Sequence, residues 1–517
     1  MMRSFLRLVA APALTMLGLL LCSQHAPAEV TLPALISDHM LIQRDMPVRI
    51  WGRADAQEEV SIQFLGRSVS TRADALGRWR VYLPPALAGG PYDLTVSGKN
   101  QIVVRDVLVG DVWVASGQSN MVWPVSRSDN PEKEIGSANY PQIRLFKVNL
   151  KVSELALDDV GGSWNLCAPE SVAGFSGAGY FFARHLHQKL GVPMAVIQSA
   201  WGGTPVEAWT SRPALAADAA LISVFADWAK YLEDYPEAYL RFERRTKDWE
   251  AESARAQSSG SKPGPKPAPP IGPGHPWTPS GLFNAMIAPL TRYTIRGAIW
   301  YQGENNASSH PRAYLYRRLF QTMIQDWRRA WGQGEFPFLF VQLANFGHAG
   351  SASPWPVLRE SQTQALGLAN SGMAVTIDIG NPDDIHPTNK QDVGLRLALA
   401  ARSIAYGEKL LFSGPVFQQV SREGEALRVW FAHARGGLRA KGVQLKGFEI
   451  AGPDARFHPA EARIDGETVV VQSGQVGQPA YVRYGWADSP DCNLYNSEGL
   501  PASPFRSSEW PESGSRR

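Results

Sequence analysis

The chain has 517 residues, of which 44% are hydrophobic and 19% charged, and this composition is typical of globular proteins and excludes global disorder. One hydrophobic core rarely serves more than about 300 residues, so we expect two to four structural units. Lys and Arg total 51 against 48 Asp and Glu, a near balance without the basic footprint of a protein that binds nucleic acid or anionic membranes.

The first 28 residues have the pattern of a secretory signal. Arg3 and Arg7 form a positive start, an apolar run extends from Leu8 to Leu21, and Ala26-Pro27-Ala28 fits the small-x-small cleavage rule. The apolar run is shorter than the about 20 residues that cross a bilayer, so a transmembrane anchor is disfavoured. We therefore expect residues 1–28 to be removed, and the mature chain to be periplasmic or secreted and free of the membrane.

A β-sandwich-type domain is expected over residues 29–105. Short apolar alternations broken by turn residues recur there, for example over Val48–Gly52 and Trp79–Leu83.

The sequence pattern changes over residues 106–410, where apolar segments typical of buried strands alternate with segments typical of helices. This order predicts an α/β core with a parallel sheet covered by helices on both faces, and such sheets bind ligands at the carboxyl ends of their strands. The expected strands are Val107–Ala115, Val192–Gln198, Ile295–Tyr301, Phe336–Leu343 and Met373–Ile379, and the expected helices are Gly177–Leu190 and Lys390–Tyr406, the latter with Gly407 as C-cap.

An insertion is expected at residues 214–276 of this core, and a third unit follows the core. The insertion begins with a charged helical segment, Ala214–Ala256, and continues into a Pro-, Gly- and Ser-rich loop, Gln257–Pro276. A C-terminal β domain is expected over residues 411–517, with strand patterns at Leu427–Phe431, Thr468–Gln472 and Ala480–Tyr484.

Ser119 is the candidate nucleophile. It follows an apolar strand and the glycine-containing turn Ser116-Gly117-Gln118, which places its hydroxyl and its backbone N–H at the strand's carboxyl end. A serine nucleophile needs both groups free, because its oxygen must reach a carbonyl carbon while an amide receives the developing negative charge. The same segment also fits an ordinary serine in a strand-to-helix loop, so a base is required to support the catalytic interpretation.

The segment Asp383-Asp384-Ile385-His386-Pro387 supplies that base. A carboxylate three residues before an imidazole in a tight turn can accept its Nδ1–H while Nε2 faces the serine. We therefore expect Asp383 to orient His386, with the adjacent Asp384 as a rival orienter. A helix predicted just after His386 disfavours the imidazolium and helps the ring to rest as a neutral base.

Two further loops, each directly after a predicted strand, hold the other expected oxyanion donors. The first expected donor is the backbone N–H of Ser119. In 199–205 the candidate is the N–H of Gly203, because paired glycines permit a close backbone approach. In 300–306 the candidate is the side-chain amide of Asn305, with Gln302 as the rival. Each loop alone also fits a plain connection, in which Gly and Asn are common.

Glu304 and Trp201 are candidate substrate-binding residues in the same two loops. Glu304 either binds substrate or braces its loop. Trp201 offers a flat face for a sugar ring, as do Trp123, Trp277 and Trp300, although with 17 Trp in the chain any one of these rings also suits the core.

These loops together resemble the SGNH hydrolase superfamily, and more specifically the sialate O-acetylesterase family and related bacterial carbohydrate acetylesterases. The similar segments are Gly117–Met121, Trp201–Thr204, Trp300–Glu304, Asp384–Pro387, Gly281–Ile287 and 493–506. The third block departs from the usual Gly-x-Asn-Asp, because it reads Gly303-Glu304-Asn305-Asn306. The resemblance implies an SGNH-hydrolase-like three-layer core with a parallel sheet, flanked by the two β domains.

The resemblance also implies a serine esterase that removes O-acetyl groups from carbohydrate through an acetyl-enzyme, with acetylated sialic acid as one substrate. Acetylated hemicellulose such as xyloglucan or xylan oligosaccharides is the alternative substrate. A non-catalytic carbohydrate-binding protein is the alternative of another class, against which the presence of Ser119, His386 and both aspartates argues. The oligomeric state stays open.

No cofactor or metal is expected. His185 and His187 are two residues apart on a predicted helix and point to different faces, and the chain has no His-Glu-x-x-His arrangement. Whether Cys167 and Cys492 pair in an oxidising compartment stays open.

Overall fold

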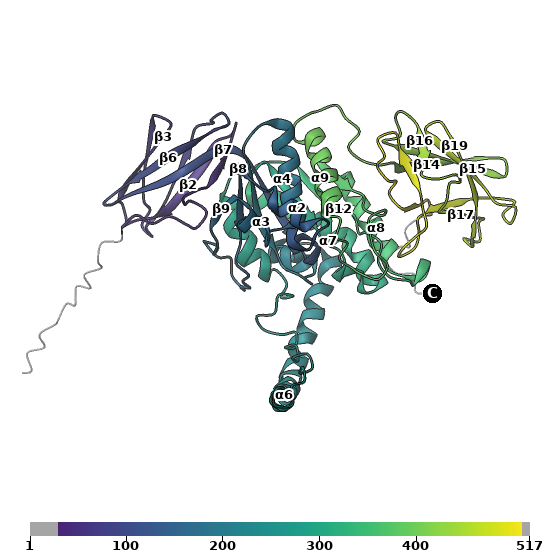
Figure 1. Cartoon of the computed structure of the whole chain (residues 1–517), viewed down its shortest axis with the longest axis horizontal. Coiled ribbons are helices and arrows are strands. Elements are labelled where there is room, and N and C mark those ends of the chain that lie inside the picture. The colour runs from purple at the N-terminus through teal and green to yellow at the C-terminus, as the bar shows by residue number, and fades with distance from the viewer. Residues whose placement is uncertain (1–28, 509–517) are drawn as a thin grey trace, which may run out of the picture.

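The computed structural model describes residues 29–508, and the expected signal sequence lies outside them. An α/β core stands between an N-terminal and a C-terminal group of β-strands (Figure 1). The core sheet has parallel strands with helices on both faces, so the predicted fold class is confirmed. None of the helices between residues 29 and 508 has the length and apolarity that a membrane span requires.

The N-terminal strands connect to the core through one long strand, β7 (Gln101–Gly117). Its first part pairs with β6 and its last part with two strands of the core, so the expected border at residue 105 falls inside a continuous strand. The predicted segments at 48–52 and 79–83 are the paired strands β2 and β5. The strands before β7 are β1 (Leu41–Gln43), β2 (Val48–Arg53), β3 (Glu59–Phe64), β4 (Arg67–Arg72), β5 (Arg78–Leu83) and β6 (Gly89–Ser97).

The core sheet has the strand order β13-β12-β11-β7-β10-β8-β9, and every neighbouring pair is parallel except β8 with β9. The segments predicted around β11 to β13 are strands with shorter bounds, and β10 lies two residues later than predicted, whereas β8 and β9 were not predicted. A proline near the start of β8 and the four-residue length of β9 weaken the local signal, and pairing with β10 holds β8 in place. The bounds are β8 (Tyr140–Lys147), β9 (Trp164–Cys167), β10 (Met194–Ala200), β11 (Gly297–Tyr301), β12 (Phe338–Val341) and β13 (Ser371–Ala374).

Helices cover both faces of this sheet because successive residues of each strand point to opposite sides. On β11, for example, Trp300 packs with α7 on one face, and Ile299 and Tyr301 pack with α4 and α9 on the other. The helix α4 has the predicted bounds, and α9 ends two residues before the predicted Tyr406. The bounds are α1 (Ser119–Val122), α2 (Pro131–Gly136), α3 (Pro169–Val172), α4 (Gly177–Leu190), α5 (Arg212–Ala216), α7 (His310–Trp331), α8 (Trp355–Thr363) and α9 (Lys390–Ile404).

The helix α6 (Ser223–Ser258) projects from the core as an arm (Figure 1). Its 36 residues correspond to a length of about 54 Å at 1.5 Å per residue. The segment after it returns along the helix, because Trp249 Nε1 donates to the Gly264 carbonyl at 2.7 Å and Gly272 lies so close to Tyr235 that a Cβ on it would be 1.9 Å from the ring. The return brings the chain from the end of the arm back to the core.

The C-terminal strands form their own hydrophobic core and are tied to the α/β part by buried charge. Arg359 on α8 is fully buried and donates to the carbonyls of Ala487 and Asp488, while Arg506 pairs with Glu360 at 2.9 Å. The strands are β14 (Val416–Glu423), β15 (Ala426–Ala432), β16 (Leu438–Ala440), β17 (Phe448–Ala451), β18 (Phe457–Pro459), β19 (Glu461–Asp465), β20 (Thr468–Gln472), β21 (Tyr481–Tyr484), β22 (Leu494–Asn496) and β23 (Phe505–Arg506).

Candidate active site

The loops that carry the candidate residues meet at the carboxyl edge of the core sheet. Gly117 at the end of β7 lies opposite Ala200 at the end of β10 and opposite Tyr301 at the end of β11. The loops that follow these three strands therefore start side by side, in the position where parallel sheets bind ligands.

The turn before Ser119 requires glycine. Gly117 has φ +137°, and a Cβ there would lie 2.1 Å from the Tyr301 carbonyl oxygen. Only glycine combines that backbone conformation with so close an approach. The next residue, Gln118, donates its N–H to the same carbonyl at 3.0 Å. Ser119 is half-buried and is the first residue of α1.

The double-glycine loop lies directly against Ser119. A Cβ on Gly202 would be 3.4 Å from the Ser119 Cβ. Gly203 is left-handed at φ +72°, and its N–H makes no hydrogen bond to another residue of the described chain. Its carbonyl accepts from Asn305 Nδ2 at 2.8 Å and from Trp277 Nε1 at 2.7 Å. The loop thus brings a free amide and the Asn305 side chain to the neighbourhood of Ser119.

The two candidates for the third donor differ in what their amides already bind. Gln302 is fully buried, and its Nε2 donates to the Thr204 carbonyl at 3.2 Å and to Asn306 Oδ1 at 2.7 Å, which uses both N–H bonds. Asn305 Nδ2 makes one such bond, to Gly203, and retains a second N–H. Of the two, Asn305 is the residue with a donor to spare.

The two candidate orienters of His386 lie differently from what the spacing predicts. Asp384 Oδ1 is 3.6 Å from His386 Nδ1 and also accepts the His386 backbone N–H at 2.8 Å. Asp383 instead pairs with His348 Nε2 at 3.0 Å, and its side chain is 84% exposed. The reason is local: Asp384 folds back onto the backbone two residues ahead, as aspartates in turns often do, and Asp383 is turned outward. The carboxylate beside His386 is therefore that of Asp384.

The serine loop and the histidine loop are in direct contact. The His386 ring stacks on Trp123 with centroids 4.8 Å apart, and the backbone N–H of Trp123 donates to the Ser119 carbonyl at 2.8 Å. Asn120 Nδ2 donates to the Ile385 carbonyl at 2.9 Å. The residues next to Ser119 thus hold the residues next to His386.

The surroundings of His386 favour a neutral imidazole. Burial is the main cause that lowers its pKa below the usual value, and the positive charges of Lys390 and Arg127 add to the effect. The carboxylate of Asp384 acts in the opposite direction. A ring that stays unprotonated to lower pH is available as a proton acceptor over a wider range.

A buried network beneath these loops joins Lys390, Asn120 and Glu304. Lys390 Nζ donates to Asn120 Oδ1 and to the Pro387 carbonyl, both at 2.7 Å, and Asn120 Nδ2 donates to Glu304 Oε1 at 2.6 Å. Burial lowers the pKa of Lys390 to about 7 and raises that of Glu304. The Glu304 carboxylate is therefore covered and held by Asn120, an arrangement that fits the bracing role among the two that the sequence left open.

A family profile described as carbohydrate esterase, sialic acid-specific acetylesterase, matches residues 275–405. Sialate O-acetylesterase of Rattus norvegicus is 32% identical over 526 residues, covering 91% of this chain and 93% of the relative. That of Homo sapiens is 30% identical over 529 residues, covering 91% of each. The crystal structure of a carbohydrate acetylesterase from Xanthomonas citri superposes with a TM-score of 0.79 at 41% identity, covering 93% of this chain and all of that one.

The chain belongs to the sialate O-acetylesterase family. The resemblance inferred from the four loops is confirmed, and with it the assignment of the protein as an enzyme that hydrolyses acetyl esters of carbohydrates. The non-catalytic alternative is therefore not supported.

The four tryptophans near the loops of this esterase divide into buried and accessible rings. Trp300 is fully buried, and Trp123 is 8% exposed and covered on one face by His386. Trp201 and Trp277 are half-buried. Trp277 directly follows the expected insertion at 214–276, and its Nε1 donates to the Gly203 carbonyl, so its ring lies beside the candidate oxyanion loop.

Sequence reasoning missed two residues of the site, Asn120 and Lys390. Asn120 directly follows Ser119 in the segment that predicted the nucleophile, so its position next to Ser119 was a sequence signal for its side-chain amide. Lys390 had no local signal, because it opens a helix whose first turn faces the interior only in the folded chain. The two cysteines, Cys167 and Cys492, are both free thiols that burial protects, with pKa values raised to about 12 and about 11.

Proposed function

We propose that Ser119 is the nucleophile of this esterase, that His386 is its general base, and that Asp384 orients the imidazole. The support is the contact between the two loops: Trp123 and Asn120, next to Ser119, bind His386 and Ile385. Asp384 lies 3.6 Å from Nδ1, which leaves Nε2 as the ring atom for proton transfer. Asp383, which pairs with His348, has no part in this proposal.

In the proposed reaction His386 Nε2 takes the proton of the Ser119 hydroxyl while Oγ attacks the acetyl carbonyl carbon. The negative charge on the carbonyl oxygen is held by the N–H groups of Ser119 and Gly203 and by the spare N–H of Asn305. The carbon–oxygen bond to the sugar breaks, and the sugar hydroxyl leaves with the proton from His386. Water, deprotonated by His386, then attacks the acetyl-enzyme and releases acetate.

We propose an O-acetylated sialic acid as the substrate. The support is the similarity to sialate O-acetylesterases along nearly the whole chain. Trp201 and Trp277, half-buried beside the glycine loop, are the proposed contacts for the sugar ring. Acetate release from O-acetylated sialic acid, compared with acetylated xylan and xyloglucan oligosaccharides, tests this. A higher kcat/KM on either hemicellulose substrate would contradict the sialic acid proposal without affecting the assignment of the catalytic residues.

The catalytic assignment is tested by Ser119→Ala with an aryl acetate, a substrate that needs no sugar contact. We expect kcat to fall by about 10⁴-fold or more, because loss of the nucleophile removes the covalent route. Ser126→Ala, a nearby exposed serine, is the matched control and should keep full activity. Turnover of the Ser119 variant within about tenfold of the parent would overturn the assignment.

We also propose that the protein is exported to the periplasm or secreted. The support is the signal pattern of residues 1–28 in the sequence. Amino-terminal sequencing of protein produced in a bacterial host with its native leader tests this, with Glu29 as the expected first residue. A mature protein that retains Met1 would contradict it.

A further inference from the structure

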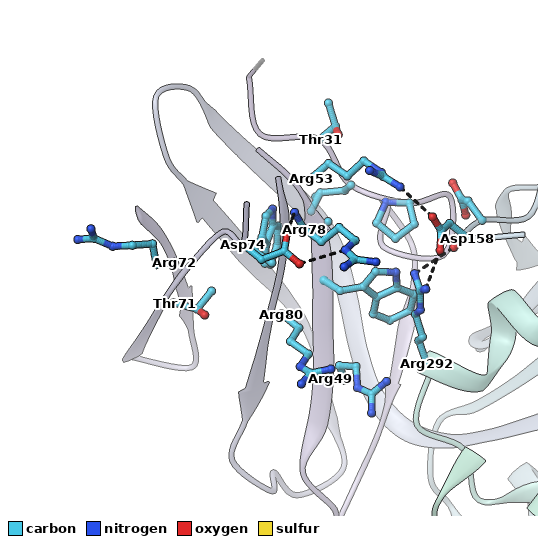
Figure 2. Close-up of a pocket in the computed structure, with 16 residues that line it drawn as sticks. Thr31, Arg49, Arg53, Thr71, Arg72, Asp74, Arg78, Arg80, Asp158 and Arg292 are labelled. Carbon is cyan, nitrogen blue, oxygen red and sulfur yellow. Dashed lines mark hydrogen bonds and ion pairs between the residues drawn. The ribbon is translucent and has the colours of Figure 1, made fainter. Parts of the chain in front are cut away.

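A cavity lies between the N-terminal strands and the core (Figure 2). Its volume is about 650 Å³, within the range of about 300–1,000 Å³ of small-molecule sites. Arg292, one of its lining residues, precedes β11, whereas Ser119 follows β7, and these two strands are parallel. The cavity is therefore at the opposite end of the core sheet from the candidate active site.

The lining of this cavity is strongly basic, although the whole chain is nearly balanced in charge. Six arginines and three aspartates line it: Arg49, Arg53, Arg72, Arg78, Arg80, Arg292, Asp74, Asp158 and Asp159. An excess of guanidinium groups at one concave surface raises the local concentration of anions.

One face of the pair β2 and β5 builds the basic wall. Trp51 lies opposite Arg80, Arg53 opposite Arg78, and Arg49 opposite Tyr82. Since alternate residues of a strand share a face, these six side chains project from one side of the pair. Arg49 and Arg80 are diagonal neighbours on that face, and Figure 2 shows their side chains running next to each other along the cavity wall.

The arginines differ in whether a carboxylate neutralises them. Arg53 and Arg292 share Asp158, at 2.8 Å and 2.7 Å, which links β2 to the core across the cavity. Arg78 pairs with Asp74 at 3.0 Å. Among the described residues, Arg49 and Arg80 have no carboxylate within ion-pair distance.

Two like charges side by side without a counter-ion are unfavourable, and an anion between them removes that cost. Arg49 is held for this role, because its Nε donates to the Tyr82 hydroxyl at 3.1 Å and its guanidinium lies 5.5 Å from the centre of the Tyr82 ring. That arrangement leaves the two terminal nitrogens of Arg49 free to form a forked pair with a carboxylate.

Trp51 adds aromatic surface to this cavity. It shares the face of Arg49 and Arg80, lines the cavity and is 6% exposed. The wall thus combines guanidinium groups with aromatic surface, a set that suits a sugar ring that carries a carboxylate.

We propose that this cavity binds an acidic glycan, with a sugar carboxylate held between Arg49 and Arg80. This binding site is separate from the site of ester hydrolysis. It would hold one part of an acidic polymer or oligosaccharide while acetyl groups on another part of the same glycan are removed. The proposal does not depend on the roles of Ser119 and His386.

The test is isothermal titration calorimetry with digalacturonic acid, in the Ser119→Ala protein so that hydrolysis plays no part. We expect binding by this protein, at least tenfold weaker binding when Arg49→Gln and Arg80→Gln are added, and weaker binding as salt rises. The single exposed substitution Arg80→Glu should have a similar effect and serves if the double variant folds poorly. Arg72→Gln is the matched control, because Figure 2 shows Arg72 pointing away from the other arginines, and it should bind as before.

Neutral cellobiose and inorganic phosphate distinguish a glycan site from a general anion site. We expect neither to reach the affinity of the acidic disaccharide. No binding of digalacturonic acid, equal loss in Arg72→Gln, or phosphate binding as tight as that of the sugar would each overturn the proposal. In the chain that retains Ser119, aryl acetate hydrolysis should be unchanged by the arginine substitutions, which separates this result from the test of the catalytic residues.

Discussion

Two buried polar clusters flank β7, and they differ in how completely they are satisfied. Asp111, in the middle of the strand, is fully buried and accepts from Arg44 and Arg296 at 3.1 Å, from Gln43 at 2.8 Å and from Tyr406 at 3.0 Å. Near the end of the strand, Asn120 separates Lys390 from Glu304, and one oxygen of Glu304, Oε2, has no partner in the described chain.

The difference indicates that the charges around Asp111 stabilise the fold, whereas those around Asn120 position the loops of the site. Around Asp111 opposite charges meet directly and fill the carboxylate's hydrogen-bonding capacity, as expected of a structural cluster. Around Asn120 the acid and the base do not meet, and the pKa of Lys390 is lowered to about 7. Burying a charged acid and base without direct contact reduces stability. Because this cluster lies beneath Ser119 and His386, we expect it to hold the loops of the site in position.

The largest effect on stability is expected from Asp111→Asn. Arg44 and Arg296 would lose the buried carboxylate that they share and would keep only the more distant Asp45, at 3.5 Å and 3.8 Å. We expect the free energy of unfolding to fall by about 3–5 kcal/mol. Urea denaturation followed by tryptophan fluorescence measures this. The kcat of the protein that remains folded should not change, and a loss of kcat without a loss of stability would reverse the roles given to the two clusters.

A paired experiment on the two buried amides sharpens the comparison. Asn120→Ala and Gln43→Ala each remove hydrogen bonds to buried partners, and each should destabilise the fold by about 1–3 kcal/mol. Only Asn120→Ala should also lower kcat, by about tenfold or more, with little change in KM, because it frees the loops of Ser119, Glu304 and His386. Equal kcat values for the two variants, measured on an aryl acetate, would remove Asn120 from the positioning role.

The lowered pKa of Lys390 predicts how stability depends on pH. Between about 7 and the unfolded value of 10.5 the unfolded chain binds the proton and the folded chain does not, so stability from this group rises with pH in that window. We expect the unfolding free energy of the parent to rise by about 1–2 kcal/mol more between pH 7 and pH 9 than that of Lys390→Met. Chemical denaturation at the two pH values decides it. Parallel behaviour of the two proteins would show that Lys390 does not titrate there.

The smallest expected effect distinguishes the two aspartates near His386. Asp384→Asn removes the negative charge that opposes the lowering of the His386 pKa, so the acid limb of kcat/KM should move to lower pH. We expect a kcat loss of about tenfold, below the ~10⁴-fold of a buried triad aspartate, because Asp384 is half exposed. Asp383→Asn is the control and should leave the pH profile in place. A shift in the Asp383 variant alone would restore the orienter that the sequence spacing predicted.

Local sequence pattern predicted the parallel core, most of its strands and the neighbourhood of Ser119. Alternation and apolar runs report burial directly, and in a parallel sheet the carboxyl ends of the strands must share one edge. Gly117 is a further local signal of this kind, because the backbone of the turn before Ser119 comes so close to Tyr301 that it leaves no room for a Cβ. The loops after β7, β10 and β11 were therefore predictable as neighbours before their contacts were known.

Tertiary structure alone decided which side chains in those loops are free. The sequence spacing favoured Asp383 over the adjacent Asp384, and the fold turns Asp383 to His348 and Asp384 to His386. The Gln302 amide is already bound to Thr204 and Asn306, which its position in the sequence does not reveal. Lys390 enters the site because α9 places its first residue against Asn120, 270 residues away along the chain. Periodicity records which residues are buried, whereas the partner of each polar group depends on distant segments that only the folded chain brings together.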